Sequence, residues 1–368
     1  MTIFKTKSVY LAAFLLFSQC GMAQNDQGKI DFETYNPPSS LVVPEHLLTK
    51  AKFPFIDVHN HQNNMPSQNL SHLLSEMDKL NMKIMVNLSG RSGDFLALSV
   101  KNAIKADPKR LIIFANVSFS GIGEAGWAEK AVKQLEDDFK AGAQGLKIFK
   151  SLGFSVTDNK GAIVAVDDKR LNPIWEKCGQ LGIPVLIHTA DPKQFWDKPN
   201  AENERWLELL TKPGRAREKS DGFSWEELIA QQHNLIKNNP RTNFIAAHFA
   251  WYANNLDRLG QLLDAYPNMT VEFGAIIAEL GRQPRRAKEF FNQYQDRILF
   301  GKDSWVPSEY STYFRVLETE DEYFPYHKKY HAYWKMYGLG LSDEVLKKVY
   351  YKNALRLIPG IDKSQFPD

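Results

Sequence analysis

The chain has 368 residues, and its 46 lysines and arginines nearly balance 43 aspartates and glutamates, for a formal net charge of +3. So small a surplus argues against a protein that binds nucleic acid, because the phosphate backbone is held by many more basic side chains. The length suits one large domain with a single core, or two small ones.

The first 23 residues have the pattern of a secretory signal peptide. Lys5 and Lys7 form a short positive region, an apolar run follows at 9–17, and small residues at 21–23 suit a cleavage site. The apolar run is too short to span a membrane as a mature helix, and no later run is long enough. We therefore expect export to the periplasm or the medium, with Gln24 as the new N-terminus.

Cysteine usage agrees with a domain stabilised by its core. Cys20 lies in the predicted signal, which leaves Cys178 alone, so the mature chain has no internal disulfide. Lipid anchoring through Cys20 is the alternative to cleavage, although Gln19 stands where a small residue is usual. After a polar, proline-punctuated lead-in at 24–51, we expect one barrel domain over residues 52–368.

Eight short apolar runs alternate with amphipathic stretches that have the i, i+3, i+4 spacing of surface helices. The runs lie at 55–61, 83–90, 111–118, 145–150, 184–190, 243–250, 269–275 and 297–304. Buried strands separated by helices are typical of parallel βα units, and eight units predict an α/β fold of the (β/α)₈ TIM-barrel type. A doubly wound open sheet is the alternative, but no run is followed by a Gly-rich dinucleotide fingerprint.

Two segments interrupt this alternation. Residues 157–168 suggest a small hairpin or loop after the fourth strand, and a long excursion at 191–240 follows the fifth. In a barrel the loops after strands form the catalytic face, so both segments could cover a site. Beyond the eighth strand we expect C-terminal helices, whose packing on the barrel would explain the aromatic-rich segment 323–338.

Ionisable side chains gather at the carboxyl ends of the predicted strands. Strand residues two apart share a face, so the histidines of "HNH" should project together. Taken singly, a histidine could be a satisfied core residue, the aspartate a helix cap and the lysine an ion-pair partner. Four of the nine histidines nevertheless fall at the same ends of strands, which predicts a site for zinc or a similar ion, manganese being the alternative. The candidate ligands are His59, His61, Lys147, His188, His248 and Asp303.

Five stretches resemble the amidohydrolase superfamily, which comprises metal-dependent hydrolases built on a distorted (β/α)₈ barrel. They are "DVHNH" at 57–61, "GLKIFK" at 145–150, "VLIHTA" at 185–190, "FIAAHF" at 244–249 and "ILFGKDSW" at 298–305. The sequence looks most like the branch that holds lactone hydrolases and non-oxidative decarboxylases of carboxylated rings.

The resemblance implies roles for the candidate ligands. His59 and His61, aided by Asp303, would bind the more buried of one or two ions. His188 and His248 would bind a second ion or divide between ligand and substrate contact. In two-metal members, the position of Lys147 holds a carbamylated lysine that bridges both ions, whereas one-metal members need no such bridge.

By this resemblance the protein is a metal-dependent hydrolase in which metal-bound hydroxide attacks a lactone, amide or ester carbonyl of a small molecule. Asp303 would carry the proton to the leaving group, and His248 or His188 would stabilise the developing negative charge. Metal-dependent decarboxylation of a carboxylated ring is the alternative reaction. A non-catalytic metal-containing binding protein is a third reading, which Asp303 argues against because a receptor needs no proton shuttle.

Substrate contacts are predicted where side chains follow the strands. Trp251 and Trp305 would form walls for a flat ring, and Lys150 or Arg282 would bind an anionic group. Glu272 should point to the barrel mouth, as an acceptor for substrate hydroxyl groups or as an orienter of a metal ligand.

Overall fold

The structure is a computed structural model that describes residues 35–218 and 222–367. The predicted signal peptide lies outside the described residues. Residues 35–43 form no helix or strand, and a compact unit begins at Pro44, earlier than the predicted boundary at 52. This earlier start has a local cause, because the backbone N–H of His46 donates to the buried carboxylate of Asp321 at 2.7 Å.

The predicted strand segments all form strands. They are β1 (Phe55–Asn60), β2 (Met82–Asn87), β3 (Leu111–Ile113), β4 (Ala115–Asn116), β5 (Leu146–Ile148), β6 (Val185–Ile187), β7 (Phe244–Ala246), β8 (Met269–Glu272) and β9 (Ile298–Leu299). Neighbours in this order pair in parallel, in one sheet of β1 to β3 and a second of β4 to β9. All residues of these strands are buried except Lys83 of β2 and Asn116 of β4, which are partly exposed. Such burial is typical of parallel sheets with both faces covered.

The strands form two sheets because the third predicted strand is divided at Phe114. The backbone N–H of Phe114 still donates to Asn87 O at 3.0 Å, so the chain passes from one sheet to the next without leaving its neighbour. Gly145 makes room for the Phe114 ring, which a Cβ at that position would strike. At the other gap, Val58 N–H donates to Phe300 O at 2.9 Å. The first and last strands thus lie side by side, in the strand order of a TIM-type barrel.

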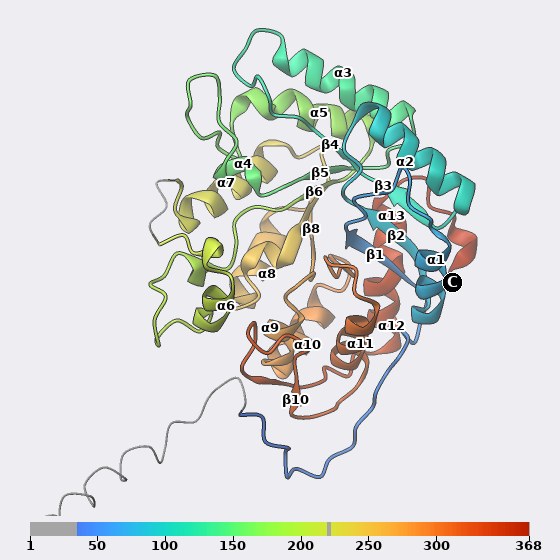
Figure 1. Ribbon diagram of the computed structural model, residues 1–368, viewed down its shortest axis with the longest axis vertical. Helices are drawn as coiled ribbons and strands as arrows, with labels where there is room; N and C mark the ends of the chain where they lie inside the picture. The colour runs from blue at the N-terminus through green and yellow to red at the C-terminus, as the bar shows by residue number, and fades with distance from the viewer. Residues whose placement is uncertain (1–34, 219–221, 368) are drawn as a thin grey trace, which may run out of the picture. The chain divides into compact units, whose positions relative to one another are not determined.

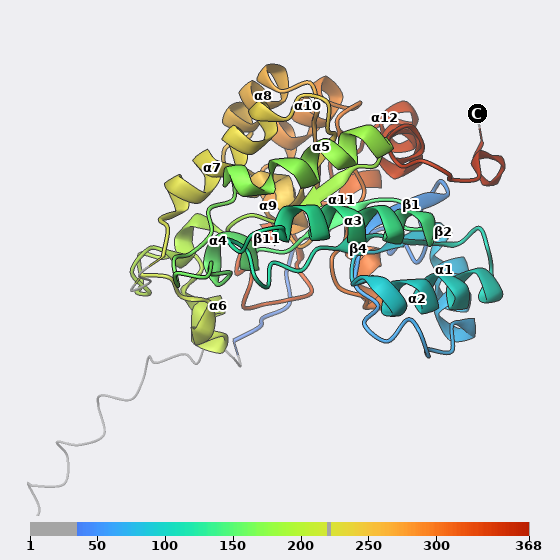
Figure 2. The ribbon, with the colours of Figure 1, turned by 90° about the horizontal axis from the view of Figure 1, so that it is seen from above.

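Helices surround the strands (Figures 1 and 2). They are α1 (Ser71–Leu80), α2 (Gly93–Ala106), α3 (Trp127–Lys140), α4 (Ser151–Phe154), α5 (Asn172–Leu181), α6 (Trp206–Thr211), α7 (Trp225–Asn238), α8 (Leu256–Ala265), α9 (Ile277–Gly281), α10 (Pro284–Gln293), α11 (Tyr310–Glu318), α12 (Asp343–Lys347) and α13 (Asn353–Leu357). No helix among the described residues combines the length and apolarity needed to cross a membrane.

Both predicted excursions leave the carboxyl ends of strands. A bridge between Thr157 and Ile163 forms the small hairpin that follows β5 and α4. The long excursion after β6 contains α6 and then leads into α7, which begins at a capping box formed by Ser224 and Glu227. Helices α4 and α6 lie on the same side of the compact unit in both views (Figures 1 and 2).

The C-terminal region contains the predicted helices α11 to α13, but the aromatic-rich segment 323–338 is not helical. It forms the short antiparallel pair β10 (Phe324–Pro325) and β11 (Lys335–Met336), so the expectation that helix packing explains this segment is wrong. Proline explains part of the difference, because Pro325 has no N–H to donate within a helix.

A cluster of aromatic rings joins the first strand to the last strand and to the C-terminal helices. Phe55 of β1 lies 4.8 Å from Phe300 and 5.5 Å from Phe314 of α11, measured between ring centroids. Tyr350 closes the cluster at 5.6 Å from Phe300. Each such pair contributes about 0.5–1.5 kcal/mol beyond the burial of its surface, so this packing fixes the ends of β1 and β9.

Candidate metal centre

The structure brings the six candidate ligands together at the carboxyl ends of the strands. The ring of His248 lies 5.1 Å from that of His59 and 4.3 Å from that of His188, and the His59 and His61 rings are 5.4 Å apart. These ligands are His59 in β1, His61 just after it, Lys147 in β5, His188 after β6, His248 after β7 and Asp303 after β9.

Three of these residues have ligand atoms close enough to share one ion. The ligand atoms of His59, His248 and Asp303 all lie within 4.8 Å of one another. Asp303 Oδ1 is 3.4 Å from His59 Nε2 and 3.6 Å from His61 Nε2. Ligand atoms about 2.0–2.2 Å from a tetrahedral ion stand roughly 3.4 Å apart, so these separations fit a divalent metal.

Hydrogen bonds to the Nδ1 atoms orient the histidines toward this point. Nδ1 of His248 lies 2.6 Å from the carbonyl oxygen of Gly274, which only accepts, so Nδ1 carries the proton and Nε2 keeps its lone pair. His59 has the same arrangement, with Nδ1 2.9 Å from the Glu272 carboxylate. His61 Nδ1 lies 2.8 Å from the Ser89 hydroxyl, which holds the ring but can donate or accept. Partners that only accept, as for His59 and His248, fix the tautomer of a metal-binding histidine.

The carboxylate of Glu272 is hydrogen-bonded to two of the candidate ligands, His59 and His248. It is fully buried, and one oxygen receives both His59 Nδ1–H and the backbone N–H of His248, while the other receives the N–H of Gly274 at 2.6 Å. Burial alone would raise the pKa of Glu272, but His59 and these hydrogen bonds lower it to about 2. Both of its oxygens accept hydrogen bonds from these groups, which suits the predicted role of Glu272 as an orienter of a metal ligand, and its role as a substrate contact stays an alternative prediction.

Asp57 holds the two strand ends that carry ligands. Its buried carboxylate accepts the backbone N–H groups of His59 and Lys302 at 3.0 and 3.1 Å, and the hydroxyl of Tyr310 at 2.6 Å. Asp303 follows Lys302 with a φ of 84°, in the left-handed region, and its own N–H donates to His59 O at 2.7 Å. The end of β9 is thus tied to the end of β1, which aims Asp303 at the histidines.

Burial sets the charge states around this point. It lowers the pKa of His61 to about 3, and it also lowers the pKa values of His188 and His248, so that these rings are neutral at pH 7. Burial would raise the pKa of Asp303, but the neighbouring histidines and Lys147 outweigh it and hold the pKa below its usual range. Neutral imidazoles beside an ionised carboxylate are the protonation states that a metal requires.

Two buried polar atoms without a partner also fit a metal at this place. Lys147 Nζ and His188 Nε2 are buried and have no hydrogen-bond partner among the described residues. Each such group costs about 1–3 kcal/mol unless something satisfies it. Burial lowers the pKa of Lys147 to about 8, which makes its neutral amine accessible near neutral pH. The donor set and these atoms fit a bound divalent ion.

A left-handed turn positions His248 and the predicted wall residue Trp251. Residues 248 to 251 have φ angles of 57°, 53°, 50° and 58°, although none is glycine. Such a conformation costs roughly 1–2 kcal/mol per residue and is found mainly where function requires it. The turn stacks the Trp251 indole on the His248 ring, with centroids 4.6 Å apart. The turn thus places Trp251 directly against a candidate ligand, and its role as a wall for the substrate stays a prediction.

The other predicted substrate contacts lie in less favourable places. Arg282 is bound by the Glu204 carboxylate at 2.8 and 3.1 Å and by Glu279 at 3.0 Å. The rings of Trp305 and Tyr310 pack in an edge-to-face arrangement, with centroids 5.7 Å apart. Neither side chain has a hydrogen bond, ion pair or ring contact with the four histidines among the described residues.

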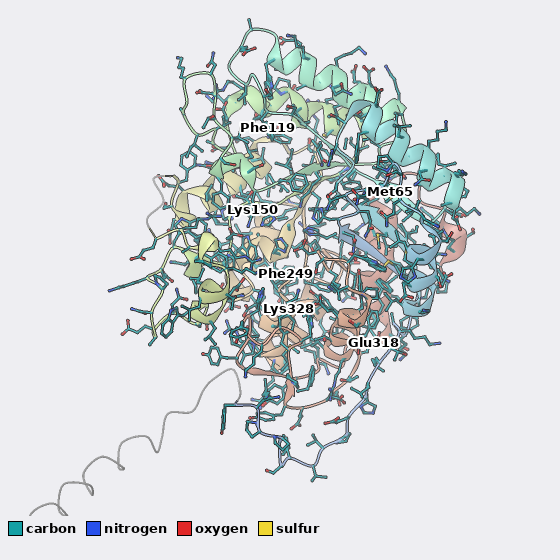
Figure 3. The ribbon with its side chains drawn as sticks, viewed as in Figure 1. Met65, Phe119, Lys150, Phe249, Glu318 and Lys328 are labelled. Atoms are coloured by element: carbon teal, nitrogen blue, oxygen red, sulfur yellow. The ribbon has the colours of Figure 1, made fainter. Side chains whose placement is uncertain are left out.

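Lys150, labelled in Figure 3, lies directly before α4, and its Nζ pairs with Asp191 at 2.5 Å, so its role as a substrate contact stays a prediction.

Sequence reasoning missed several residues of the site. Ser89 after β2 and the Gly274 carbonyl orient histidines, and Phe149 lies beside His61 with ring centroids 5.7 Å apart. Phe149 could have been found by its place two residues after Lys147 in "LKIFK", whereas a single serine or a backbone carbonyl leaves no signal in a sequence.

Adding a methyl group at Gly301 should disturb the centre. A Cβ there would overlap Glu272 Oε2 and approach His59 Cβ at 3.0 Å, so Glu272 must move. We expect Gly301→Ala to weaken zinc binding about tenfold or more, as is typical when an orienting partner is displaced. Calorimetric titration with zinc measures this. The control is Gly214→Ala, because nothing lies within 4 Å of a Cβ there; equal affinities in the two variants would contradict the role given to Glu272.

Solved structures of known proteins share this fold. An uncharacterised TIM-barrel protein from Bordetella bronchiseptica aligns with a TM-score of 0.50 and 16% identity, covering 82% of this chain and 97% of that one. A 2,6-dihydroxybenzoate decarboxylase aligns with a TM-score of 0.51 and 14% identity, covering 83% of this chain and 99% of that one. The 4-oxalomesaconate hydratase from Rhodopseudomonas palustris aligns with a TM-score of 0.50 and 14% identity, covering 83% of this chain and 95% of that one. A comparison with curated protein sequences finds no match.

An α/β fold of the TIM-barrel type with histidines and an aspartate gathered at its strand ends defines a class of metal-dependent barrel enzymes. The family model described as amidohydrolase matches residues 106–360, which is more than half of the chain. The chain therefore belongs to the amidohydrolase family, and it is an amidohydrolase-type enzyme. The match begins after His59 and His61, so the place of these two histidines in the site comes from the structure.

Proposed function

We propose that the protein is an exported, metal-dependent hydrolase that cleaves a lactone, amide or ester bond of a small molecule. The observation that supports this most directly is the group of His59, His248 and Asp303, whose ligand atoms lie within 4.8 Å of one another. His61 and His188, whose rings lie 5.4 Å from His59 and 4.3 Å from His248, would contribute the remaining nitrogen ligands.

A divalent ion supplies positive charge that lowers the pKa of water to about 7 and polarises a carbonyl group. Asp303 is the group that moves the proton. Its side chain is 36% exposed, whereas His59 and His248 are almost fully buried, so Asp303 can meet both water and substrate. Its pKa is held below the usual range, so it is ionised and can accept a proton and pass it to the leaving group. His248 would stabilise the negative charge that develops on the carbonyl oxygen.

Decarboxylation of a carboxylated ring is the second candidate. It needs only one ion, and the described residues contain one group of three or more His, Cys, Asp or Glu side chains close enough to hold a metal. Stacking of Trp251 on His248 provides a flat wall that suits a ring. A screen of lactones, amides and carboxylated aromatic acids distinguishes the two reactions, because decarboxylation releases carbon dioxide and hydrolysis releases a new acid.

Metal content tests the proposal without a known substrate. We expect about one zinc or manganese ion per chain by elemental mass spectrometry. Substitution of His59 by alanine should remove most of it. Replacing His233, a histidine of α7 that stacks on Tyr252, should leave the metal content unchanged. The intact mass of gently handled protein shows whether Lys147 is carbamylated. We expect the carbamate if the chain holds two ions, because this lysine bridges both ions in two-metal members of the superfamily. A chain that holds no metal after incubation with zinc or manganese would overturn the proposal.

Export rests on the signal pattern of residues 1–23, which lie outside the described residues. N-terminal sequencing of the protein from its native cells tests it. A mature chain that begins at Gln24 supports cleavage, and one that begins at a lipid-modified Cys20 supports anchoring.

A further inference from the structure

Residues 192–215, the first part of the excursion after β6, are attached to the barrel mainly through side chains. Among the described residues, no backbone–backbone hydrogen bond joins this segment to a residue outside 192–217. Its two buried apolar side chains, Phe195 and Leu209, do not belong to the hydrophobic core of the barrel, and only the partly exposed Trp196 packs against that core. A segment with so few apolar contacts opens locally at a lower free energy than the whole fold.

Arg205 links this segment to α9. It is 8% exposed, and one terminal nitrogen of its guanidinium donates to Glu208 Oε2 in the same segment at 2.9 Å. The other terminal nitrogen donates to the buried carboxylate of Glu279 in α9. A buried ion pair that loses one partner leaves the other charge uncompensated, so Arg205 and Glu279 hold the segment and the helix together.

A second ion pair runs beside the first. Glu204 accepts two hydrogen bonds from Arg282, which follows α9, at 2.8 and 3.1 Å. Arg215 also binds Glu208, but its side chain is 41% exposed and both residues belong to the segment. That pair therefore stabilises the segment itself and does not attach it to the barrel.

The remaining polar links to the barrel are longer or more exposed. Glu208 Oε1 lies 3.7 Å from His331 Nδ1, and Trp196 Nε1 donates to a backbone carbonyl at 3.3 Å. Lys193 pairs with Glu226 at 2.9 Å, but the two side chains are 48% and 62% exposed. Exposed ion pairs contribute little to stability, so the pairs with α9 account for most of the polar attachment.

This attachment lies beside the candidate metal centre. Arg205 and Glu279 line one cavity together with Trp251, and Pro192, where the segment begins, lines it as well. The Trp251 indole stacks on the ring of the candidate ligand His248, with centroids 4.6 Å apart. The segment therefore borders the mouth on the side of Trp251, and its opening would uncover that side of the centre.

We propose that residues 192–215 form a strap that opens to let small molecules reach the metal centre, and that Arg205 is the positioning residue that latches this strap to α9 through Glu279. The inference rests on the proposed function, because access matters only if the chemistry takes place at the histidines. It gives a task to two buried charges that, among the described residues, form no ion pair with the candidate ligands.

Hydrogen–deuterium exchange of the purified protein, with and without zinc, tests the latch. Arg205→Gln should speed the exchange of the α6 amides about tenfold, because the strap then opens more often. Glu279→Gln should have the same effect on α6, although it lies outside the strap. Arg205→Lys keeps the charge but loses the fork of donors, so its exchange should fall between. The matched control is Arg215→Gln, which removes an exposed partner of Glu208 and should stay within about twofold of the wild type.

Zinc kinetics test whether the strap covers the mouth. In Arg205→Gln, zinc uptake and zinc release to excess EDTA should both become about tenfold faster, because the strap alters only the barrier between the free and bound states. The dissociation constant should stay at the wild-type value. A role of Arg205 in the general stability of the fold would not raise both rates by the same factor.

Each part of the proposal can fail separately. Unchanged exchange in α6 of Arg205→Gln, or exchange that is faster throughout α2 and α3 as well, would show that Arg205 is no latch. Faster exchange in α6 with unchanged zinc rates would show that the strap does not cover the mouth. A protein that binds no zinc would overturn the proposed hydrolase, whereas the exchange series would still decide whether Arg205 latches the strap.

Discussion

Replacing Asp303 by asparagine should reduce turnover by a factor of about 10² to 10⁴ at saturating zinc, which is the usual contribution of a positioned acid or base. Asparagine keeps the shape of the side chain and one oxygen for the metal, but it cannot accept a proton at neutral pH. Asp303 is the only carboxylate beside the histidines with a substantial exposed fraction, 36%, among the described residues. The measurement is the turnover number on the substrate that the screen identifies, with metal content recorded for each sample.

Metal loss must be separated from loss of the proton carrier. Asp303→Asn should still bind a substrate analogue, with a dissociation constant close to that of the wild type once zinc is saturating. Asp138 of α3 provides the control, because its buried carboxylate accepts hydrogen bonds from the N–H of Gly93 at 2.7 Å and from Gln134 at 3.1 Å, neither of which is a candidate ligand. Asp138→Asn should retain turnover. A fully metal-loaded Asp303→Asn enzyme with turnover within about threefold of the wild type would show that another group moves the proton.

Strand positions could be predicted from the sequence because parallel strands buried on both faces need short, nearly continuous apolar runs. The break in the third strand could not be predicted from the sequence. Phe114 interrupts the third strand through its contact with Gly145, and that contact joins two segments whose pairing only the fold determines. The β10–β11 pair was missed for a related reason, since aromatic residues favour strands and helix packing alike.

For the site, the residue types and their strand-end positions were enough to predict that the ligands converge. The left-handed turn at His248 was not predictable, because its residues lack the glycine that usually marks positive φ. Arg282 shows a second limit. It follows a strand and carries the charge that suits an anionic group, but only the folded chain shows that Glu204 and Glu279 already bind its guanidinium.

Glutamine at position 272 should weaken zinc binding by about 10- to 100-fold, the typical cost of losing a group that orients a metal ligand. Glu272 accepts three hydrogen bonds, two at one oxygen from His59 and His248 and one at the other from Gly274. Glutamine has a single oxygen, so its NH₂ group must face an N–H donor on one side or the other. An unsatisfied buried donor costs about 1–3 kcal/mol, and the free energy of unfolding should fall by that amount.

A lower free energy of unfolding in Glu272→Gln would not by itself show that Glu272 orients the ligands. The control is therefore another buried glutamate whose ion pairs stabilise the fold but do not involve the candidate ligands. Glu279 of α9 meets this condition, because only 7% of its side chain is exposed and it forms ion pairs with Arg205 and Arg282. Glu279→Gln should also lower the free energy of unfolding, yet its zinc affinity should equal that of the wild type. Cobalt in place of zinc adds a spectrum, since its visible absorption reports the geometry of the ligands. A Glu272→Gln protein with the wild-type cobalt spectrum and zinc affinity would mean that His59 and His248 are held by the backbone turn and strand ends alone.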